Sequence, residues 1–331
     1  MIGVMSEVIN TDLDRLAKSE FSRISLGLKP SGLIHIGTAL TFLNGAIALT
    51  GNRDATLDAT VMDLDFDFQR GSDFVSFQVT PDAQACHNLM KEHTEMETRE
   101  ALGEIARYFG VSPGRINVGQ FSDVTYVPQF QDYMRGLFGT LEGRRLLGRT
   151  IKSGNNKSTS FLAPICSSCG HSSTHPPTLR QADKETILET RCYNTGCDVE
   201  KYSVNLTDPA RVNIFYLVDP IRDLIPNSNG IPADVHIFGG DYGSMYGTDG
   251  TPKAVRVLRL MEGLSETPPS IYVGPVIVYN GSKVGKSLSN GFTVNSIRQR
   301  YSNWVERLHD LLKLHPTAPV IDLKDNPRIF S

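Results

Sequence analysis

Apolar residues in this chain gather in short runs rich in β-branched and aromatic side chains, and between these runs they recur at helical spacing. The short runs predict strands at residues 24–26, 55–64, 212–218, 234–238 and 270–278. The helical spacing predicts helices at residues 12–21, 38–49, 81–111, 129–147, 252–263 and 294–314. Strands that alternate with helices in this way predict an α/β fold with a parallel sheet.

Apolar stripes define the buried faces of several predicted helices, including those at 81–111 and 294–314. The stripe of the helix at 81–111 consists of Leu89, Met96, Leu102, Ile105, Ala106 and Phe109. The stripe of the last helix consists of Ile297, Trp304, Leu308 and Leu311. Residues 315–331 are rich in Pro, Asp and Lys, which predicts a tail packed on the surface.

The sequence L-K-P-S-G-L-I-H-I-G at residues 28–37 lies between the first strand and the helix at 38–49. A helix that begins there directs backbone N–H groups and the positive end of its dipole at the turn, which favours a phosphate. Pro30, Ser31 and Gly32 form the turn. Gly32 and Gly37 let a nucleotide approach the backbone because they carry no Cβ, and His35 is then a donor to phosphate oxygens. The alternative is a surface turn with a half-buried histidine that caps the helix.

A second segment, rich in glycine and lysine, follows the strand at 270–278. It reads G-S-K-V-G-K-S-L-S-N-G at residues 281–291 and places Lys283 and Lys286 three residues apart. Two ammonium groups at this spacing on a loop suit a transient anion such as pyrophosphate. Together with the turn at 28–37, this segment (residues 281–291, the lysine loop) predicts a nucleotide site.

The strand at 234–238 ends in Gly239, Gly240 and Asp241. Two glycines permit close approach of a ligand to the backbone, and the carboxylate suits a pair of ribose hydroxyls, as in dinucleotide-binding folds. On its own, the same tripeptide is also a common turn.

Four of the five cysteines fall into two close pairs. Cys166 and Cys169 form a C-x₂-C knuckle, and Cys192 and Cys197 follow within the same polar segment. Four thiolates in two such pairs suit one tetrahedral Zn²⁺ ion in a structural role. His171 and His175 are alternative ligands, and four reduced structural cysteines are the alternative to a metal.

Weaker candidates follow the second predicted strand. Asp63, Asp65 and Asp67 alternate with apolar residues, so their carboxylates share one face of an extended strand. Such carboxylates suit Mg²⁺ or the ammonium group of a substrate, while a solvated strand edge is the alternative. We keep Asp63 and Asp65, together with His87, as candidates for amino-acid binding. The alternative for His87 is an ordinary helix residue near a pocket mouth.

A basic cluster ends the predicted helix at 129–147. Its five cations are Arg144, Arg145, Arg149, Lys152 and Lys157. Such a cluster is able to contact an RNA backbone, because phosphate contacts supply much of the affinity for RNA. A solvated helix end is the alternative interpretation.

The 331 residues carry a net charge of −3, with 40% hydrophobic and 21% charged residues. A chain of this size forms about two globular domains, and its charge balance gives no general attraction to nucleic acid or to a membrane. The first ten residues lack the apolar core of a signal peptide, and no run approaches the roughly 18 apolar residues of a membrane span. We therefore expect a cytoplasmic protein without membrane contact.

Five motifs occur along the chain in a characteristic order: P-S-G-L-I-H-I-G-T, P-D-A-Q-A-C-H, A-P-I-C-S-S-C-G, F-G-G-D-Y-G-S and K-V-G-K-S. This order resembles the catalytic region of the class I, archaeal-type lysyl-tRNA synthetases, in patches between residues 22 and 291. The first and last motifs resemble the HIGH and KMSKS signatures of class I aminoacyl-tRNA synthetases in general. The resemblance implies a Rossmann-type parallel sheet with a zinc-ribbon-like insert, and ATP-dependent activation of an amino acid.

The resemblance also implies roles for individual residues. The residues implied in contacts with the ATP phosphates are His35, Gly37, Thr38, Lys283, Lys286 and Ser287. Gly239 and Asp241 would lie under the adenosine ribose, next to Gly240. Mg²⁺ would share in neutralising the charge that builds on pyrophosphate.

The pattern divides the chain into four parts. Residues 1–155 form the first half of the Rossmann domain, 156–206 the zinc-binding insert, 207–292 the second half with the lysine loop, and 293–331 a C-terminal helix and tail. An anticodon-reading domain is absent from this division. The residues A-L-T-F-L after the first motif and G-G-D-Y before Gly243 depart from the lysyl pattern. We therefore expect a truncated paralogue with altered choice of substrate and tRNA.

The function that these residues favour is adenylation of an amino acid. The acyl group would then pass to tRNA through its acceptor end, or to a small molecule or carrier protein in a specialised pathway such as natural-product synthesis. The alternative from another class is a non-catalytic synthetase-like module that binds an amino acid or tRNA to regulate a partner. The presence of His35, Lys283 and Lys286 favours the enzyme, because a binding module has no use for lysines that handle pyrophosphate.

Overall fold

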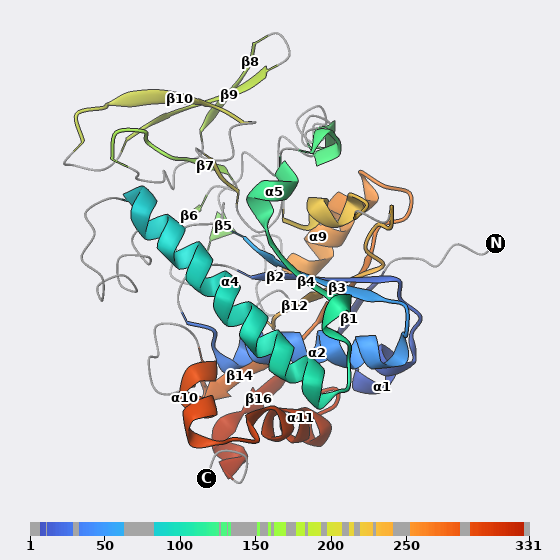
Figure 1. Ribbon diagram of the computed structural model, residues 1–331. Helices are drawn as coiled ribbons and strands as arrows, with labels where there is room; N and C mark the ends of the chain where they lie inside the picture. The colour runs from blue at the N-terminus through green and yellow to red at the C-terminus, as the bar shows by residue number, and fades with distance from the viewer. Residues whose placement is uncertain are drawn as a thin grey trace.

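Figure 1 shows a computed structural model of the chain. The residues it describes are 7–10, 12–28, 33–62, 83–125, 127–130, 132–133, 151–152, 158–159, 162–169, 177–182, 185–192, 197–206, 212–214, 219–227, 230–240, 252–284 and 292–327. Within these residues, no helix combines the length and the apolar character needed to cross a membrane.

A six-stranded sheet forms the centre of the molecule, with the strand order β1-β13-β12-β2-β3-β4. Its strands are β1 (Val8–Asn10), β2 (Arg23–Leu28), β3 (Thr56–Val61), β4 (Ile116–Gln120), β12 (Val235–Phe238) and β13 (Ser270–Val273). All five neighbouring pairs are parallel. The predicted α/β fold with a parallel sheet is therefore confirmed, and β1 is a strand that the hydrophobic pattern did not predict.

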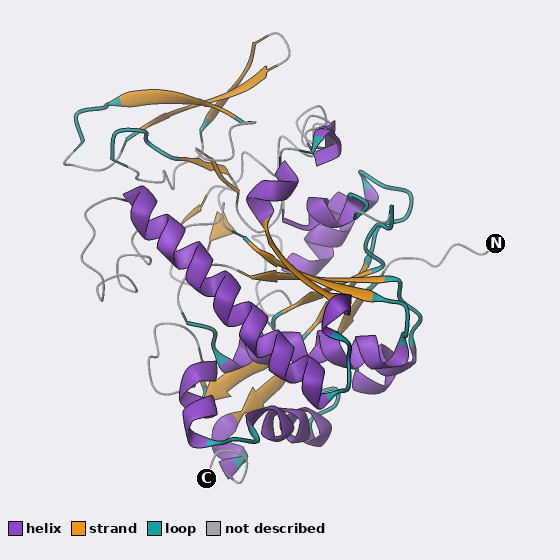
Figure 2. Ribbon diagram, in the orientation of Figure 1, coloured by secondary structure: helices purple, strands orange, loops and turns teal. Residues whose placement is uncertain are grey.

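Helices and apolar clusters cover both faces of this sheet (Figures 1 and 2). One face packs against α1 (Leu13–Lys18), α2 (Ile36–Gly51), α4 (Ala83–Tyr108) and α11 (Trp304–Leu314). The opposite face packs against α5 (Phe121–Thr125), the 3-10 helix η3 (Asp219–Leu224) and α9 (Lys253–Glu262). Alternate side chains of the strands serve the two faces, as in β12, where Ile237 belongs to the first cluster and Phe238 to the second.

The helix that follows β2 is buried almost all round. Twelve residues of α2 are buried, from Ile36 to Leu49. A helix with apolar residues on every side belongs in the middle of a protein, and here it lies between the sheet and α4 and α11. This position fixes its first turn, which carries His35, at the edge where β2 ends.

The insert between the two halves of the sheet is built from short antiparallel strands. They are β5 (Ile151–Lys152), β6 (Ser158–Thr159), β7 (Leu162–Pro164), β8 (Thr178–Ala182), β9 (Glu185–Arg191) and β10 (Lys201–Asn205). In Figure 1, β8, β9 and β10 lie at the top, beyond the N-terminal end of α4. The strand β11 (Val212–Ile214) pairs antiparallel with β7. The parallel sheet therefore resumes at β12, later than the predicted strand at 212–218 implied.

The predicted single strand at 270–278 is wrong. Gly274 and Pro275 divide it into β13, in the central sheet, and β14 (Val276–Tyr279), in a second sheet. β14 pairs antiparallel with β15 (Ser282–Lys283) and parallel with β16 (Val320–Asp322). The prediction of a surface tail is also wrong for this part, because β16 and the 3-10 helix η4 (Leu323–Asp325) place Ile321 and Leu323 in the core.

The predicted helix at 294–314 consists of two helices, α10 (Val294–Arg300) and α11. The break comes at Tyr301, Ser302 and Asn303, three residue types with lower helix propensity than Ala, Leu or Lys. The apolar stripe was nevertheless predicted correctly, since Ile297, Trp304, Leu308 and Leu311 are all buried.

The predicted stripe of α4 is wrong at its N-terminal end. Leu89 is 41% and Met96 is 53% exposed. The buried face instead includes Met90 and the polar residues Thr94, Glu97 and Thr98. A search for apolar spacing misses this face because three of these four residues are polar. The chain leaves α4 through the 3-10 helix η1 (Pro113–Arg115), which leads into β4.

Candidate functional site

The strand order has a switch point between β2 and β12, where successive strands are added on opposite sides. From β2 the chain passes through α2 to β3 on one side, and from β12 it passes through α9 to β13 on the other. In open parallel sheets, ligands bind outside the carboxyl ends of the two strands that flank such a point. Here these ends lead to His35 and to Gly239, so the two predicted motifs meet at this edge.

His35 caps the N-terminus of α2. Its backbone is extended, and its Nδ1 accepts a hydrogen bond from the amide of Gly37 at 3.1 Å. Because Nδ1 is the acceptor, the neutral ring carries its proton on Nε2, which lies 3.4 Å from Oγ1 of Thr38. The Nε2–H group of the imidazole therefore donates to the Thr38 hydroxyl in this structure, and the two polar groups together suit an anionic oxygen.

The amides of the first helical turn already have acceptors within the protein. Ile36 N–H donates to Phe292 O at 2.9 Å, and the amides of Thr38 and Ala39 donate to His35 O at 3.0 and 3.1 Å. The sequence argument from open amides at a helix N-terminus therefore does not apply to this turn as it stands. At this turn, the side chains of His35 and Thr38 are therefore the groups that would contact a phosphate.

The segment that closes the lysine loop lies directly beside His35. Val294 N–H donates to Ile34 O at 2.8 Å, and His35 and Thr293 form an antiparallel bridge. Thr293 also begins α10 with a capping box, in which its hydroxyl and Ser296 exchange hydrogen bonds with the backbone. This pairing joins the first predicted motif to the far end of the second.

The near end of the lysine loop is anchored to the same region. Lys283 is exposed on β15, opposite Val278 of β14. The next residue, Val284, is buried and donates its amide to Ile277 O at 2.8 Å. A Cβ at Gly37 would lie 4.0 Å from the side chain of Ile277. Lys286 and Ser287 lie between these anchors, outside the described residues.

The end of β12 packs closely against neighbouring backbone. A Cβ on Gly240 would stand 2.4 Å from Val276 N and 2.6 Å from the carbonyl of Pro275, so only glycine fits. A Cβ on Gly239 would lie 3.7 Å from Oγ1 of Thr41, one turn into α2. Gly240 is thus required by packing between β12 and β14, while Gly239 faces the first turns of α2.

Several predicted site residues cannot be placed. Pro30, Ser31, Gly32, Asp63, Asp65 and Asp241 lie outside the described residues, as does the basic cluster at 144–157 apart from the strand residue Lys152. His87 lies within α4, but its side chain is outside the described part. Their predicted roles stay predictions.

A buried ionic cluster lies on the opposite face of β2, and the sequence analysis did not single it out. Asp223 of η3 accepts hydrogen bonds from Oγ of Ser25 at 2.6 Å and from Nδ1 of His236, and pairs with Nε of Arg222 at 3.2 Å. Arg222, Asp223 and His236 are each at most 2% exposed. The only sequence signal was a histidine inside the apolar run of β12, with an Arg-Asp pair shortly before it.

The protonation of this cluster follows from its contacts. Burial raises the pKa of Asp223, but His236, Arg222 and the hydrogen bond from Ser25 outweigh burial and bring the pKa down to about 2. Burial lowers the pKa of His236, against the opposing effect of Asp223. Asp223 is therefore ionised at neutral pH, and Arg222 is its fixed positive partner.

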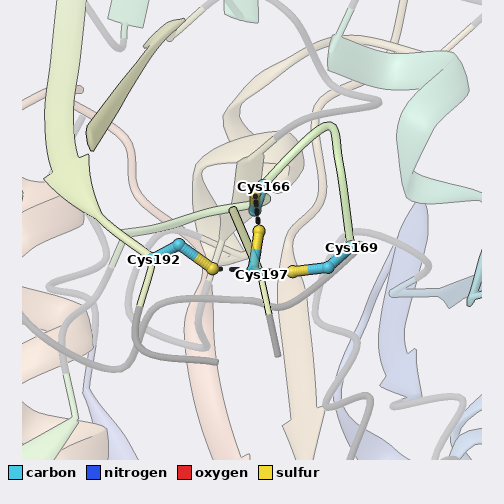
Figure 3. Close-up of side chains that lie close together, drawn as sticks. All are labelled: Cys166, Cys169, Cys192 and Cys197. Carbon is cyan, nitrogen blue, oxygen red and sulfur yellow. Dashed lines mark hydrogen bonds between the residues drawn. The ribbon is translucent and has the colours of Figure 1, made fainter. Parts of the chain in front are cut away.

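The four predicted zinc ligands come together in the insert (Figure 3). All four sulfur atoms lie within 4.8 Å of one another, with Cys166 and Cys197 3.7 Å apart and Cys169 and Cys192 3.5 Å apart. Tetrahedral Zn²⁺ with Zn–S bonds of about 2.3 Å requires sulfur atoms about 3.8 Å apart. The donor set and its spacing fit one such ion, and four thiolates leave no position open for a substrate.

The thiol of Cys197 ionises more readily than an ordinary cysteine thiol. A hydrogen bond from the backbone of Val199 is the main reason that its pKa is lowered to about 7. Burial raises the pKa of the Cys166 thiol. A metal ion would overcome the second effect, because coordinated thiols bind as thiolates.

No protein-family model matches this chain, and no curated protein matches it in sequence. Among solved structures, it is similar to the tyrosyl-tRNA synthetase of Aeropyrum pernix, with 11% identity and a TM-score of 0.43, over 84% of this chain and 62% of that one. The tyrosyl-tRNA synthetase of Archaeoglobus fulgidus, complexed with L-tyrosine, gives 12% identity and a TM-score of 0.44, over 92% of this chain and 74% of that one.

A third similar structure is AlbC, a cyclodipeptide synthase from Streptomyces noursei. Its identity is 14% and its TM-score 0.37, over 76% of this chain and 94% of that one. The chain spans less than two thirds of the length of the tyrosyl-tRNA synthetase from Aeropyrum pernix. The fold and the site described above rest on the strand order and contacts of this chain itself.

Proposed function

We propose that this protein catalyses the ATP-dependent adenylation of an amino acid in the manner of a class I aminoacyl-tRNA synthetase. The observation that carries the proposal is the antiparallel pairing of residues 34–36 with residues 292–294. It brings the end of the lysine loop beside His35, at the edge of the sheet where a parallel α/β fold binds its ligand. Two motifs at opposite ends of the sequence thereby share one site.

The chemistry requires little covalent participation from the protein. The carboxylate of an amino acid is already a nucleophile at neutral pH, so its attack on the α-phosphorus of ATP needs no general base. Pyrophosphate leaves as the acyl-phosphate bond forms. The protein then has to hold two anions in line and neutralise the charge that builds on the leaving group.

The named residues suit these tasks. His35 donates from Nε2 to a phosphate oxygen, with Thr38 as its neighbour. Lys283, Lys286 and Ser287 hold the pyrophosphate portion through the transition state, and a bound Mg²⁺ would supply further positive charge to it. On the other side of the site, Gly239 allows the adenosine to approach, and Asp241 accepts from the ribose hydroxyls.

The substrate side of the proposal is less specific in its residues. Asp63, Asp65 and His87 are the candidates for contacts with the amino acid. Pro30, Ser31 and Gly32 belong to the ATP side of the proposal. The motif order resembles the lysyl enzymes, whereas the residues after the first motif differ from them, so lysine is one member of the panel to be tested. The acceptor of the acyl group is the 3′ end of tRNA, a small molecule or a carrier protein.

In this proposal the cysteine cluster would hold a structural Zn²⁺ in the insert. The strands around it are short, and the described strands β8, β9 and β10 contribute only Leu188, Val204 and their partly buried neighbours to an apolar cluster. A metal cross-link supplies stability where apolar burial is small. The ion takes no part in the adenylation step.

ATP–pyrophosphate exchange tests the proposal. The purified protein is assayed with Mg²⁺ and a panel of amino acids, with and without total tRNA, beside His35→Ala and an exposed-residue control, Lys313→Ala. Exchange that depends on one amino acid and is lost in His35→Ala supports adenylation and names the substrate. No exchange with any amino acid, from protein with a filled zinc site, contradicts it. Binding of an amino acid or tRNA without exchange would favour the regulatory module instead.

A further inference from the structure

A buried carboxylate, that of Glu97, contacts the segment that carries His35. Glu97, in the middle of α4, is 2% exposed. Its Oε2 accepts a hydrogen bond from the amide of Ile34 at 3.0 Å, while Oε1 is buried without a hydrogen-bond partner in the part of the chain that the structure describes. Burying a carboxylate against one amide is costly, because little replaces the water it loses.

The amide that Glu97 binds belongs to the residue directly before His35. The carbonyl of Ile34 accepts from the amide of Val294, and the amide of Ile36 donates to Phe292 O. The short segment 34–36 is therefore held by two partners, residues 292–294 and the carboxylate of Glu97.

The helix that carries Glu97, α4, also holds the helix α10, which begins at the end of residues 292–294. Arg298 of α10 forms ion pairs with Glu100 at 3.3 Å and Glu104 at 3.2 Å, both on α4. Trp304, at the start of α11, donates from its indole N–H to Glu104 at 2.5 Å. Thus α4 fixes both the segment that carries His35 and the helix that follows the lysine loop.

We propose that Glu97 is a positioning residue, which fixes the backbone at Ile34 so that His35 and Thr293 keep their register during adenylation. The inference rests on the proposed function. An apolar side chain would fill the same space at lower cost, but it would leave the Ile34 amide without an acceptor. Glu97 acts through that amide and does not touch the substrate.

The surroundings of Glu97 indicate how its contribution depends on pH. Burial raises its pKa, against the hydrogen bond from Ile34 and the charges of His93 and Arg298, while Glu100 acts in the same direction as burial. A carboxyl whose pKa is raised on folding favours the folded state when protonated, and this contribution is lost as the pH rises through the raised pKa. The bond to Ile34 is strongest when the group is ionised, so positioning weakens as the solution is acidified.

Three variants separate positioning from stability. Glu97→Gln keeps an oxygen acceptor for Ile34 but does not titrate, Glu97→Ala removes the acceptor, and Glu92→Gln is the matched control at an exposed position of the same helix. The measurements are ATP–pyrophosphate exchange over a range of pH, and hydrogen–deuterium exchange of the peptides covering residues 33–38 and 292–296.

We expect Glu97→Ala to lower kcat for exchange by about 100-fold, the effect of a misplacement of about 1 Å, with KM for the amino acid nearly unchanged. Glu97→Gln should keep kcat at neutral pH and lose activity less steeply on acidification than the wild type or Glu92→Gln. Deuterium uptake should rise in both peptides in Glu97→Ala only.

Wild-type kinetics and wild-type deuterium uptake in Glu97→Ala would overturn the inference. If that variant does not fold, Glu97→Gln decides alone: an acid dependence identical to that of Glu92→Gln overturns it. If the wild type shows no exchange with any amino acid, the proposed function fails. The deuterium uptake of the two peptides then still tests whether Glu97 positions the His35 segment.

Discussion

The guanidinium of Arg222 occupies the space beside Gly27 into which a side chain at that position would project. A Cβ at position 27 would stand 3.1 Å from Nη2 and 3.3 Å from Nη1 of Arg222. The same guanidinium lies 3.3 Å from Oγ of Ser25 and contacts the sulfur of Met62, next to the end of β3. The glycine in β2 thus makes room for a buried cation at the carboxyl edge of the sheet.

Gly27→Ala should therefore destabilise the protein by about 1 to 3 kcal/mol, because the new methyl group pushes Arg222 out of its packed position. Equilibrium unfolding in urea measures the change. Gly103→Ala is the matched control: it lies inside α4 with no atom within 4 Å of its added Cβ. The control should be stabilised by about 0.5 to 1 kcal/mol, and equal effects in the two variants would contradict the packing argument.

Asp223→Asn should cost about 3 to 5 kcal/mol at neutral pH, because it leaves Arg222 buried without its anionic partner. The folded pKa of Asp223 is about 2, below the ordinary value of 3.8. Its ionised form therefore stabilises the protein fully above pH 3.8, and this stabilisation, about 2 kcal/mol, is lost as the pH falls towards 2.

Urea unfolding at neutral and acid pH checks this prediction. The wild type should lose more stability on acidification than Asp223→Asn does. Asp310→Asn, at an exposed ion pair with Lys313, should change stability by less than about 0.5 kcal/mol. A parallel acid dependence of wild type and Asp223→Asn would contradict the assignment of the low pKa.

Metal analysis of the purified protein should find about one Zn²⁺ per chain. Cys197→Ser should lose most of this metal, since it removes one of four ligands, whereas Ser167→Ala, at an exposed position within the knuckle, should retain it. Chelation should raise deuterium uptake in residues 162–206 and leave the central sheet protected. Full zinc content in Cys197→Ser would contradict the four-cysteine site.

Lys286→Ala should lower kcat for pyrophosphate exchange by about 100- to 1,000-fold, as does the loss of other oriented charge contacts in transition states. KM for the amino acid should change little, because the lysine acts on the leaving group. Lys324→Ala, an exposed lysine of η4, is the control. A rise in KM for ATP with kcat unchanged would contradict this, because it would show that the lysine binds the ground state and the transition state equally well.

The parts of the fold that sequence predicted are those with strong local signals. The turn before His35 follows a β-branched run and precedes a long apolar segment, so strand, turn and helix were each recognisable. The cysteine pairs were recognisable from spacing alone, because the chemistry of the ion fixes their number. β1, by contrast, is three residues long and owes its existence to pairing with β13, which no local pattern reports.

Buried polar residues account for most of what sequence missed at the site. Met90, Thr94, Glu97, Ala101 and Ile105 recur at helical spacing and are all buried. Counting only apolar residues therefore shifted the predicted face of α4 towards Leu89 and Met96. A charged residue at a position where the helical period requires burial was the available signal for Glu97. The contacts of Arg222 depend on three separate segments, and no spacing within the sequence reveals them.

The pairing of β7 with β11 has a consequence for how this protein tolerates change. Pro164 is opposite Val212, so the chain leaves the body of the molecule and re-enters it at neighbouring points. A segment whose two ends are adjacent can change in length without shifting the register of the strands on either side. Leu188, Val204 and Leu206 pack in the apolar cluster that covers one face of the sheet and have to stay. The rest of the zinc-bearing region is open to insertions and new binding surfaces while the parallel sheet and its edge stay as they are.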